Sequence, residues 1–148
     1  MKKIMIVDDN YLSAEGIEKN IDWETLNAEI IHVCYNGTSA IEAMKKEPAD
    51  LIISDIEMPD LDGISMSRQA LEINPMVKII LISAYDKFEY ARRALLLGAL
   101  DYIEKPLDYA YLIQKVKNAF ALMEKEQKNL QLLKQSRPLL TEKFFREI

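Results

Sequence analysis

The chain has 148 residues, of which 49% are hydrophobic and 29% are charged, and its formal net charge is −5. This length supports one hydrophobic core, and the composition is typical of a globular protein. The negative charge argues against a general nucleic-acid-binding surface. No apolar run reaches the roughly 18 residues of a transmembrane helix, and Ile4–Val7 is too short for a signal peptide. We therefore expect a cytoplasmic protein that does not contact a membrane.

Cysteine and histidine are almost absent from the chain. Cys34 is the one cysteine and His32 the one histidine, which excludes an internal disulfide and a multi-cysteine or histidine-rich metal site. We expect both residues to pack within a strand, since the thiol has no neighbouring base or second cysteine. Any chemistry must therefore rest on carboxylates, hydroxyls and lysine.

Short apolar runs alternate along the chain with segments of helical periodicity. In chain order, the expected strands and the helices that follow them are Lys3–Val7 and Tyr11–Asn20, Glu29–Cys34 and Ser39–Lys46, Leu51–Ser54 and Ile64–Ile73, Val77–Ile82 and Lys87–Leu97, and Leu100–Ile103 with a long helix from Asp108. This alternation predicts βαβ units. Right-handed crossovers then give a doubly wound α/β fold, a five-stranded parallel sheet with helices on both faces.

The last helix is expected to extend beyond the sheet. Apolar residues keep a three-four spacing along it, at Leu112, Val116, Ala119, Met123, Leu130 and Leu133, with a break at Glu126. We expect the helix to end before Pro138, because proline inside a helix removes a hydrogen bond and clashes with the preceding turn. Two interpretations of the tail stay open. It forms an extended helix, alone or paired as a short coiled coil, or only Leu112–Met123 pack on the sheet and the rest is a frayed linker.

Polar side chains follow four of the expected strands, at the edge where open α/β sheets bind ligands. Asp8 and Asp9 follow the first strand, and Asp55 follows the third. Ser83 follows the fourth strand and Lys105 the fifth. Each residue alone has an ordinary explanation, such as a helix cap or a solvated charge. Their joint placement predicts a functional site.

Three carboxylates at one edge repel one another and raise one another's pKa unless a cation lies among them. Mg²⁺ suits the position, because it prefers oxygen ligands and shares phosphate oxygens, so Asp8, Asp9 and Asp55 are candidate ligands. A carboxylate is also a nucleophile that forms an aspartyl phosphate. Lys105 would place positive charge on the phosphoryl oxygens, and Ser83 would donate a hydrogen bond to them.

Four motifs resemble those of the response-regulator receiver domains of bacterial two-component systems. They are Ile-Val-Asp-Asp at 6–9, Ser-Asp-Ile-Glu-Met-Pro-Asp-Leu-Asp-Gly at 54–63, Ile-Ser-Ala-Tyr at 82–85 and Gly-Ala-Leu-Asp-Tyr-Ile-Glu-Lys-Pro at 98–106. The resemblance covers roughly residues 2–122. It implies the flavodoxin-like receiver fold with strand order 2-1-3-4-5. Residues 1–122 would then form a phospho-accepting receiver domain, and residues 123–148 a helical linker towards a missing output domain.

The resemblance also implies how the acidic residues act. Asp55 would accept the phosphoryl group from the phosphohistidine of a sensor histidine kinase. Mg²⁺ would lie on Asp8, Asp9, Asp55 and the backbone carbonyl of Glu57. The side chain of Glu57 adds an acid beside the pocket, which would either slow the entry of anionic donors or help to place a hydrolytic water.

The resemblance implies further roles on the fourth and fifth strands. Lys105 would contact the phosphoryl group and precede a cis peptide bond to Pro106. Ser83 and Tyr102 would form the switch, in which the hydroxyl moves to a phosphoryl oxygen and the ring turns inward. A packing role for the aromatic ring of Tyr102 stays an open alternative.

A finer resemblance points to response regulators that end in an AraC-type DNA-binding domain. It rests on Ile21–Trp23, Phe88–Ala91 and Leu139–Phe144, although for the Trp23 side chain we expect simple packing. No helix-turn-helix pair follows, so we expect DNA to be bound only through an output domain absent from this chain. A homodimer is possible through the last helix and fifth strand, or through the helical tail.

Two alternatives differ in class. A phosphatase of the haloacid dehalogenase type also forms an aspartyl phosphate, but it needs a second aspartate where this chain has Glu57. A stand-alone or phosphorylation-independent receiver would act as a protein-interaction module, for which a site residue should be missing, and none is. We therefore expect a regulator that catalyses only its own phosphorylation and dephosphorylation, not an enzyme.

Overall fold

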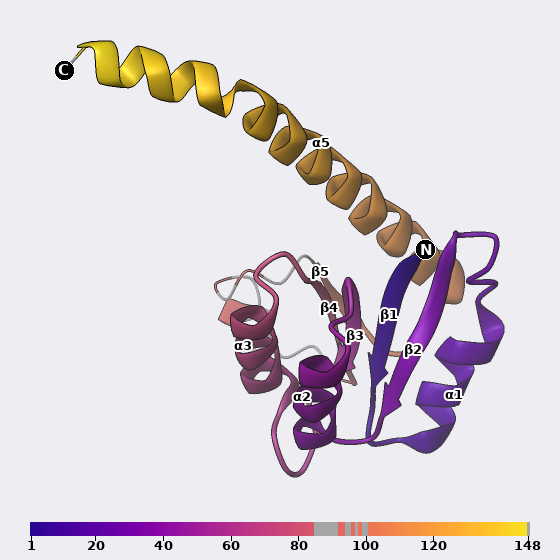
Figure 1. Ribbon diagram of the computed structural model, residues 1–148. Coiled ribbons are helices and arrows are strands. Elements are labelled where there is room, and N and C mark those ends of the chain that lie inside the picture. Colours follow the sequence, from indigo (N-terminus) through magenta and orange to yellow (C-terminus); the bar gives the residue numbers. More distant parts are fainter. Residues whose placement is uncertain (85–91, 94–95, 97, 99–100, 148) are drawn as a thin grey trace.

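A computed structural model of the chain describes residues 1–84, 92, 93, 96, 98 and 101–147, with side chains up to residue 135. The elements are β1 (Lys2–Val7), α1 (Tyr11–Asn20), β2 (Ala28–Cys34), α2 (Gly37–Lys46), β3 (Leu51–Asp55), α3 (Gly63–Ile73), β4 (Lys78–Ser83), β5 (Asp101–Glu104) and α5 (Tyr109–Glu147) (Figure 1). They confirm the predicted alternation of strands and helices. The expected helix at Lys87–Leu97 lies largely outside the described residues.

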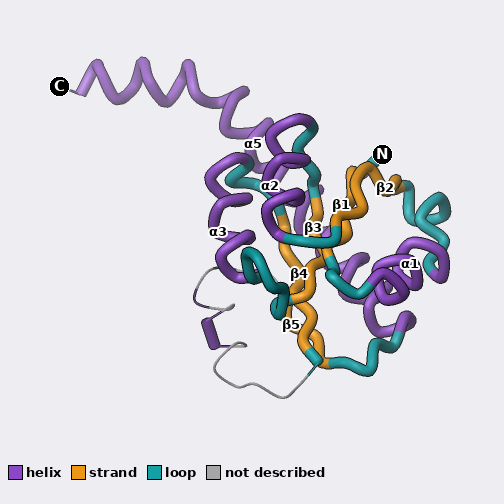
Figure 2. The backbone as a smooth tube through the Cα atoms, turned by 90° about the horizontal axis from the view of Figure 1, so that it is seen from below, coloured by secondary structure: helices purple, strands orange, loops and turns teal. Residues whose placement is uncertain are grey.

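The five strands form one parallel sheet in the order β2-β1-β3-β4-β5, as predicted. Helices α2 and α3 cover one face of the sheet and enclose one apolar core. Helices α1 and α5 cover the other face and enclose a second core. Figure 2 shows α2 and α3 on one side of the strands and α1 on the opposite side. Strands β1 and β3 are therefore buried on both faces, as their apolar sequences require.

Three of the helices begin immediately after a polar residue that caps them. The side-chain oxygens of Asn10, Asn36 and Asp62 accept backbone N–H bonds from the residue three positions later, at 3.2, 2.8 and 2.7 Å. Such caps satisfy amide groups that have no partner inside the helix. For α1 the cap leaves only Asp8 and Asp9 between strand and cap, which keeps both acids at the edge of the sheet.

The residues expected to pack do so. Trp23 is 6% exposed in the core under α1 and α5, and its indole N–H donates to the carbonyl of Ile17 at 3.3 Å. Cys34 is buried at the end of β2, and burial raises the pKa of its thiol to about 11. His32 lies on the same strand, with Nε2 2.9 Å from the carbonyl oxygen of Glu47.

Helix α5 is longer than predicted, since it continues through Pro138 to Glu147. The expectation that it ends before Pro138 is wrong. Proline has a φ that suits a helix, so its cost is one lost hydrogen bond and a clash with the carbonyl of Lys134. A bend absorbs both, and the outer part of α5 changes direction (Figure 1). Among the described helices, none is long and apolar enough to cross a membrane.

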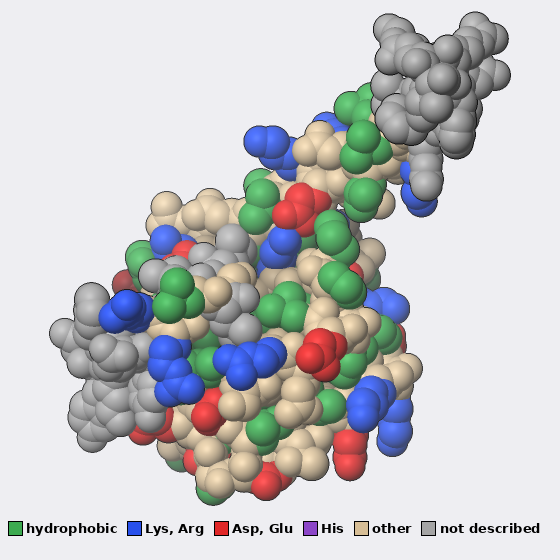
Figure 3. Space-filling model, turned by 90° about the vertical axis from the view of Figure 1, so that its left-hand side faces the viewer, with side chains coloured by type: hydrophobic (Ala, Val, Ile, Leu, Met, Phe, Trp, Pro, Cys, Tyr) green, Lys and Arg blue, Asp and Glu red, His purple; other side chains and the backbone are tan. Residues whose placement is uncertain are grey.

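The part of α5 that extends beyond the sheet, after Glu126, carries exposed leucines, and we call this part the arm. Leu130, Leu132 and Leu133 are 45%, 62% and 59% exposed. Figure 3 shows hydrophobic side chains together with Lys and Arg along this arm where it leaves the body of the molecule. The arm therefore presents an apolar surface outside the two cores.

Candidate functional site

Three aspartates meet at the carboxyl end of the central strands. Strands β1 and β3 pair in register, with Val7 opposite Ser54, so the residues that follow, Asp8 and Asp55, lie side by side. Carboxylate oxygens of Asp8, Asp9 and Asp55 lie within 4.8 Å of one another. Asp8 is 2% and Asp55 6% exposed, whereas Asp9 is exposed. The three acids thus form a pocket with two buried members and one solvent-facing member.

Lys105 reaches into this pocket from the end of β5. Its Nζ lies 3.5 Å from Oδ2 of Asp8 and 3.6 Å from Oδ2 of Asp55. The Lys105 amide donates to the carbonyl of Ser83 at 2.7 Å, which fixes its backbone to β4, and the peptide bond to Pro106 is cis. A single ammonium group therefore lies against both buried carboxylates.

Ser83 ends β4 one position beyond Ile82, the residue paired with Asp55. Its side chain is fully buried, and its hydroxyl has no hydrogen-bond partner among the described residues. A buried polar group without a partner costs about 1–3 kcal/mol. The hydroxyl is therefore suited to donate to an acceptor that enters the pocket.

The charges of the pocket do not balance. Burial, and after it the charge of Asp8, raise the pKa of Asp55 to about 6, although Lys105 opposes both effects. Burial also raises the pKa of Asp8, against the amide of Asn10, which donates to Oδ1 at 2.9 Å, and against Lys105. The set of three oxygen ligands with one lysine fits Mg²⁺, because a divalent cation would offset the remaining negative charge.

Gly63 supports Asp55 from the loop that follows β3. Its amide donates to the carbonyl of Ile56 at 2.8 Å. A Cβ at this position would lie 2.2 Å from the carbonyl oxygen of Asp55. The loop can therefore fold back over Asp55 only with a glycine here. Gly63 stands in one of the four motifs, but the sequence does not reveal this role, since the contact depends on how the loop folds back.

The two remaining predicted residues flank the pocket. Glu57 lies two residues after Asp55 and is partly buried. Tyr102 lies on β5 opposite Leu81, and its half-buried ring packs against the core under α2 and α3. The packing role left open for the ring of Tyr102 is therefore present in this structure.

Comparisons with known proteins agree with this geometry. Residues 4–117 match the family model described as response regulator receiver domain. The receiver domain of AraT, a response regulator from Geobacillus stearothermophilus, is similar with a TM-score of 0.80 and 34% identity, over 85% of this chain and 98% of that one. A two-component transcriptional regulator AraC from Clostridium phytofermentans has a TM-score of 0.76 and 30% identity, over 87% and 99% of the two chains.

A third solved structure is the CheX–CheY–BeF₃–Mg²⁺ complex of Borrelia burgdorferi, with 29% identity and a TM-score of 0.71, over 80% of this chain and 89% of that one. Curated relatives are longer. The uncharacterized transcriptional regulatory protein YesN of Bacillus subtilis is 29% identical over 85% of this chain but only 34% of its own length. HptR of Staphylococcus aureus is 30% identical over 76% of this chain and 44% of its own length.

The chain thus spans less than half the length of these curated relatives. They are transcriptional regulatory proteins, and the family match covers most of the chain. The sheet order and the acidic pocket at its carboxyl edge have the form expected from the four motifs. This chain belongs to the response regulator receiver domain family of two-component signalling.

Proposed function

We propose that the chain accepts a phosphoryl group on Asp55 from the phosphohistidine of a sensor histidine kinase, in a Mg²⁺-dependent reaction, and then switches conformation to control an output. One observation carries the proposal. The buried carboxylate of Asp55 lies 3.6 Å from the ammonium of Lys105, inside a cluster of three aspartates. A nucleophile, a cation for the phosphoryl oxygens and a set of metal ligands are therefore in one pocket.

The residues of this chain divide the chemistry of the transfer. A carboxylate oxygen of Asp55 bonds to phosphorus while the bond from phosphorus to the histidine nitrogen of the donor breaks. The nitrogen keeps the electron pair of the broken bond. Lys105 holds positive charge at the phosphoryl oxygens, and Ser83 donates a hydrogen bond to one of them.

Asp8, Asp9, Asp55 and the backbone carbonyl of Glu57 would hold the magnesium ion. When bound, Mg²⁺ neutralises negative charge on the transferring group. The related CheY of Borrelia burgdorferi supports this choice of ion, because its solved complex contains Mg²⁺ together with BeF₃.

The conformational response would use Ser83 and Tyr102. The buried hydroxyl of Ser83 would turn to the new phosphoryl oxygen and so gain the acceptor that the described residues do not provide. The ring of Tyr102, half-buried on the neighbouring strand, would turn inward. A local gain of charge would thereby bias a two-state surface formed by β5 and the start of α5.

The output would lie beyond this chain. Residues 1–122 would be the receiver and residues 123–148 a helical linker to an AraC-type DNA-binding domain, through which alone DNA would be bound. Support comes from the longer transcriptional regulators among the relatives. The whole protein would act in the cytoplasm. A homodimer would form through α5 and β5 or through the exposed leucines of the helical arm.

The decisive experiment measures the intact mass after incubation with acetyl phosphate, with and without Mg²⁺. We expect a gain of about 80 Da, the mass of one phosphoryl group, only with Mg²⁺, and no gain in Asp55→Asn. A failure of the small donor leads to the same test with a phosphorylated histidine kinase. If the kinase also transfers nothing, the chain works as a phosphorylation-independent interaction module and the proposal is wrong.

A further inference from the structure

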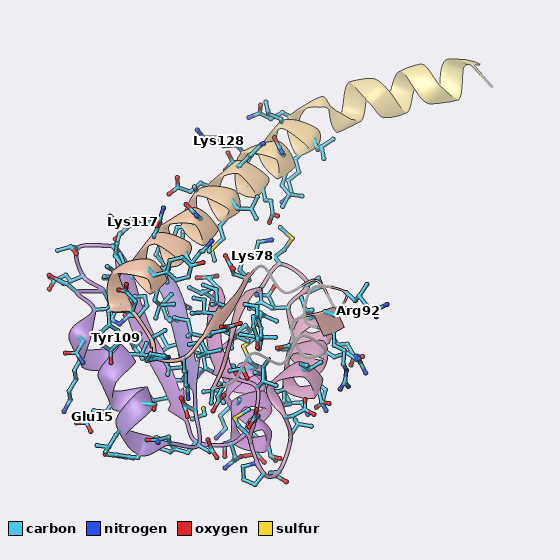
Figure 4. The ribbon with its side chains drawn as sticks, turned by 180° about the vertical axis from the view of Figure 1, so that it is seen from behind. Glu15, Lys78, Arg92, Tyr109, Lys117 and Lys128 are labelled. Carbon is cyan, nitrogen blue, oxygen red and sulfur yellow. The ribbon has the colours of Figure 1, made fainter. Side chains whose placement is uncertain are left out.

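Helix α1 has a glycine where the start of α5 lies against it. A Cβ built on Gly16 would be 2.4 Å from the hydroxyl oxygen of Tyr109, the first residue of α5, and 3.6 Å from its Cζ. The tyrosine hydroxyl therefore occupies the space that any side chain at position 16 would need. Figure 4 places Tyr109 where α5 begins, beside α1, the helix that also carries Glu15.

Helix α1, which carries Gly16, is held in place by the core. Ala14 and Ile17 of α1 are 0% and 2% exposed and belong to the core under α1 and α5. The start of the helix is capped by Asn10. Because the helix cannot move without opening the core, a side chain added at Gly16 would displace the ring of Tyr109 instead of α1.

Tyr109 directly follows the short loop that begins at Lys105. Only residues 106–108 separate Lys105 from Tyr109. Asp108 caps α5 by accepting from the amides of Ala110 and Tyr111 at 2.9 and 3.3 Å, so the loop ends in a fixed geometry. Tyr109 and Lys105 also line one cavity of about 280 Å³, together with Asp8. The loop is thus held at one end by the aspartates and at the other by α1.

We propose that Gly16 and Tyr109 are positioning residues for Lys105. The bare backbone at Gly16 lets Tyr109 sit directly on α1, and this contact holds the short loop at the position from which Lys105 reaches Asp8 and Asp55. The inference rests on the proposed phosphoryl transfer. A side chain at position 16 displaces the ring of Tyr109 from α1. The short loop then loses this contact, and the ammonium group of Lys105 is held less closely at the phosphoryl oxygens.

The test compares the wild type with Gly16→Ala, Tyr109→Phe and the double variant, using acetyl phosphate and Mg²⁺. We expect Gly16→Ala to lower the maximal rate of Asp55 phosphorylation about fivefold, because small misplacements of a catalytic group are costly. The Mg²⁺ concentration for half-maximal rate should stay the same. Tyr109→Phe removes the clashing oxygen and leaves the ring carbon at 3.6 Å. The double variant should therefore regain the rate of Tyr109→Phe within about twofold.

The rescue separates positioning from a general loss of folding. Glu18→Ala, at an exposed position of the same helix, serves as the matched control and should label at the wild-type rate. The positioning role is wrong if Gly16→Ala labels as fast as the wild type, or if the double variant stays as slow as Gly16→Ala.

Amide NMR shifts of Lys105 give a readout that does not require phosphorylation. They should move in Gly16→Ala and return in the double variant, and unchanged shifts would overturn the inference. A wild type that neither acetyl phosphate nor a phosphorylated histidine kinase labels, with shifts that move and return, would refute the proposed function while leaving the contact between α1 and the loop intact.

Discussion

The carboxyl group of Asp55 is 6% exposed and shares its surroundings with Asp8 and one lysine. The nucleophilic role proposed for Asp55 depends on those surroundings, because burial and the neighbouring acid raise its pKa to about 6. The charged form is thus disfavoured until a cation arrives. Burial also disfavours the uncharged hydroxyl of Ser83, which has no hydrogen-bond partner in the part of the chain that the structure describes. The buried acid and the buried hydroxyl both lower the stability of the fold, and a bound cation and a phosphoryl oxygen would offset this cost.

The first prediction follows from the raised pKa of Asp55. Near pH 4 the group is largely protonated in the folded chain, and as pH rises the unfolded chain loses the proton first, so ionisation of Asp55 disfavours folding up to and above pH 6. We expect Asp55→Asn to raise the free energy of unfolding by about 2 kcal/mol at pH 7 and by much less at pH 4. Denaturant unfolding without Mg²⁺ at the two pH values measures this difference. An equal effect at both values would contradict it.

The second prediction concerns Gly63. Its substitution by alanine places Cβ 2.2 Å from the carbonyl oxygen of Asp55, a backbone atom that cannot rotate away. We expect Gly63→Ala to cost about 3 kcal/mol of stability and to slow phosphorylation strongly. Gly98→Ala is the control, because its position has φ of +101° but no described atom lies within 4 Å of the added Cβ. It should cost only about 1–2 kcal/mol and leave the phosphorylation rate unchanged.

Helix α5 changes function along its length. Its first half covers the sheet with Leu112, Val116 and Ala119, all fully buried. The apolar spacing then breaks at Glu126, whose Oε1 lies 2.7 Å from Nζ of Lys78 on β4. The break is therefore a contact with the body of the domain, and the exposed leucines begin immediately beyond it. One continuous helix serves as core element, anchor and arm.

The third prediction concerns this anchor. Glu126→Ala leaves the ammonium of Lys78, 16% exposed, without its carboxylate. We expect a loss of about 1 kcal/mol in the free energy of unfolding, more than for a fully exposed pair. Glu124→Ala removes the same charge from an exposed position of the helix and should have almost no effect. Equal losses for both variants, measured by denaturant unfolding, would mean that the anchor adds no stability.

The fourth prediction tests pairing of the arm in a homodimer. A cysteine at Leu133, 59% exposed on the apolar spacing, should form an intermolecular disulfide under mild oxidation. Lys128→Cys, off that spacing, should form it much more slowly. The native Cys34 should not interfere, because it is buried and its thiol pKa is raised to about 11. Equal cross-linking of the two variants would place the dimer surface elsewhere.

The whole molecule has two cores separated by one parallel sheet. The pocket lies at the carboxyl edge of the sheet, and the arm is the C-terminal part of α5, which extends away from the body. This division keeps the two proposed functions apart in space, since the proposed phosphoryl site lies at strand ends and the proposed pairing surface lies on a helix end. Contacts of α5 with the body continue to Met123, which packs against the core, and to Glu126, which pairs with Lys78 of β4. The arm as a separate unit therefore begins after Glu126.

The fifth prediction uses this boundary. A chain ending at residue 129 should fold and label on Asp55 like the full chain, because it keeps both cores and the anchor. A chain ending at residue 122 should still label but unfold at a lower denaturant concentration, because it loses Met123 and Glu126. If the two truncated chains are equally stable, these contacts contribute nothing to the domain.

Much of this protein follows from its sequence alone. The periodicity of the apolar residues and the positions of proline and glycine predicted the strands and helices. A parallel βαβ topology then places the carboxyl end of every strand at one edge of the sheet. For that reason the sequence alone predicted that Asp8, Asp9, Asp55, Ser83 and Lys105 lie at one edge of the sheet, and the structure places the ends of their strands there. Their roles in phosphoryl transfer stay predictions. The prediction at Pro138 was wrong because a local propensity was given more weight than the continuous helix that surrounds it.

The tertiary structure decided the contacts between distant parts of the chain. Lys78 meets Glu126, Tyr109 meets Gly16, and the hydroxyl of Ser83 is enclosed without a partner among the described residues. Periodicity says which face of a helix is buried, but it does not say how far the helix slides along the sheet or which side chain it meets there. Those distances are fixed only when both cores pack, and they determine the anchor of the arm and the position of Lys105.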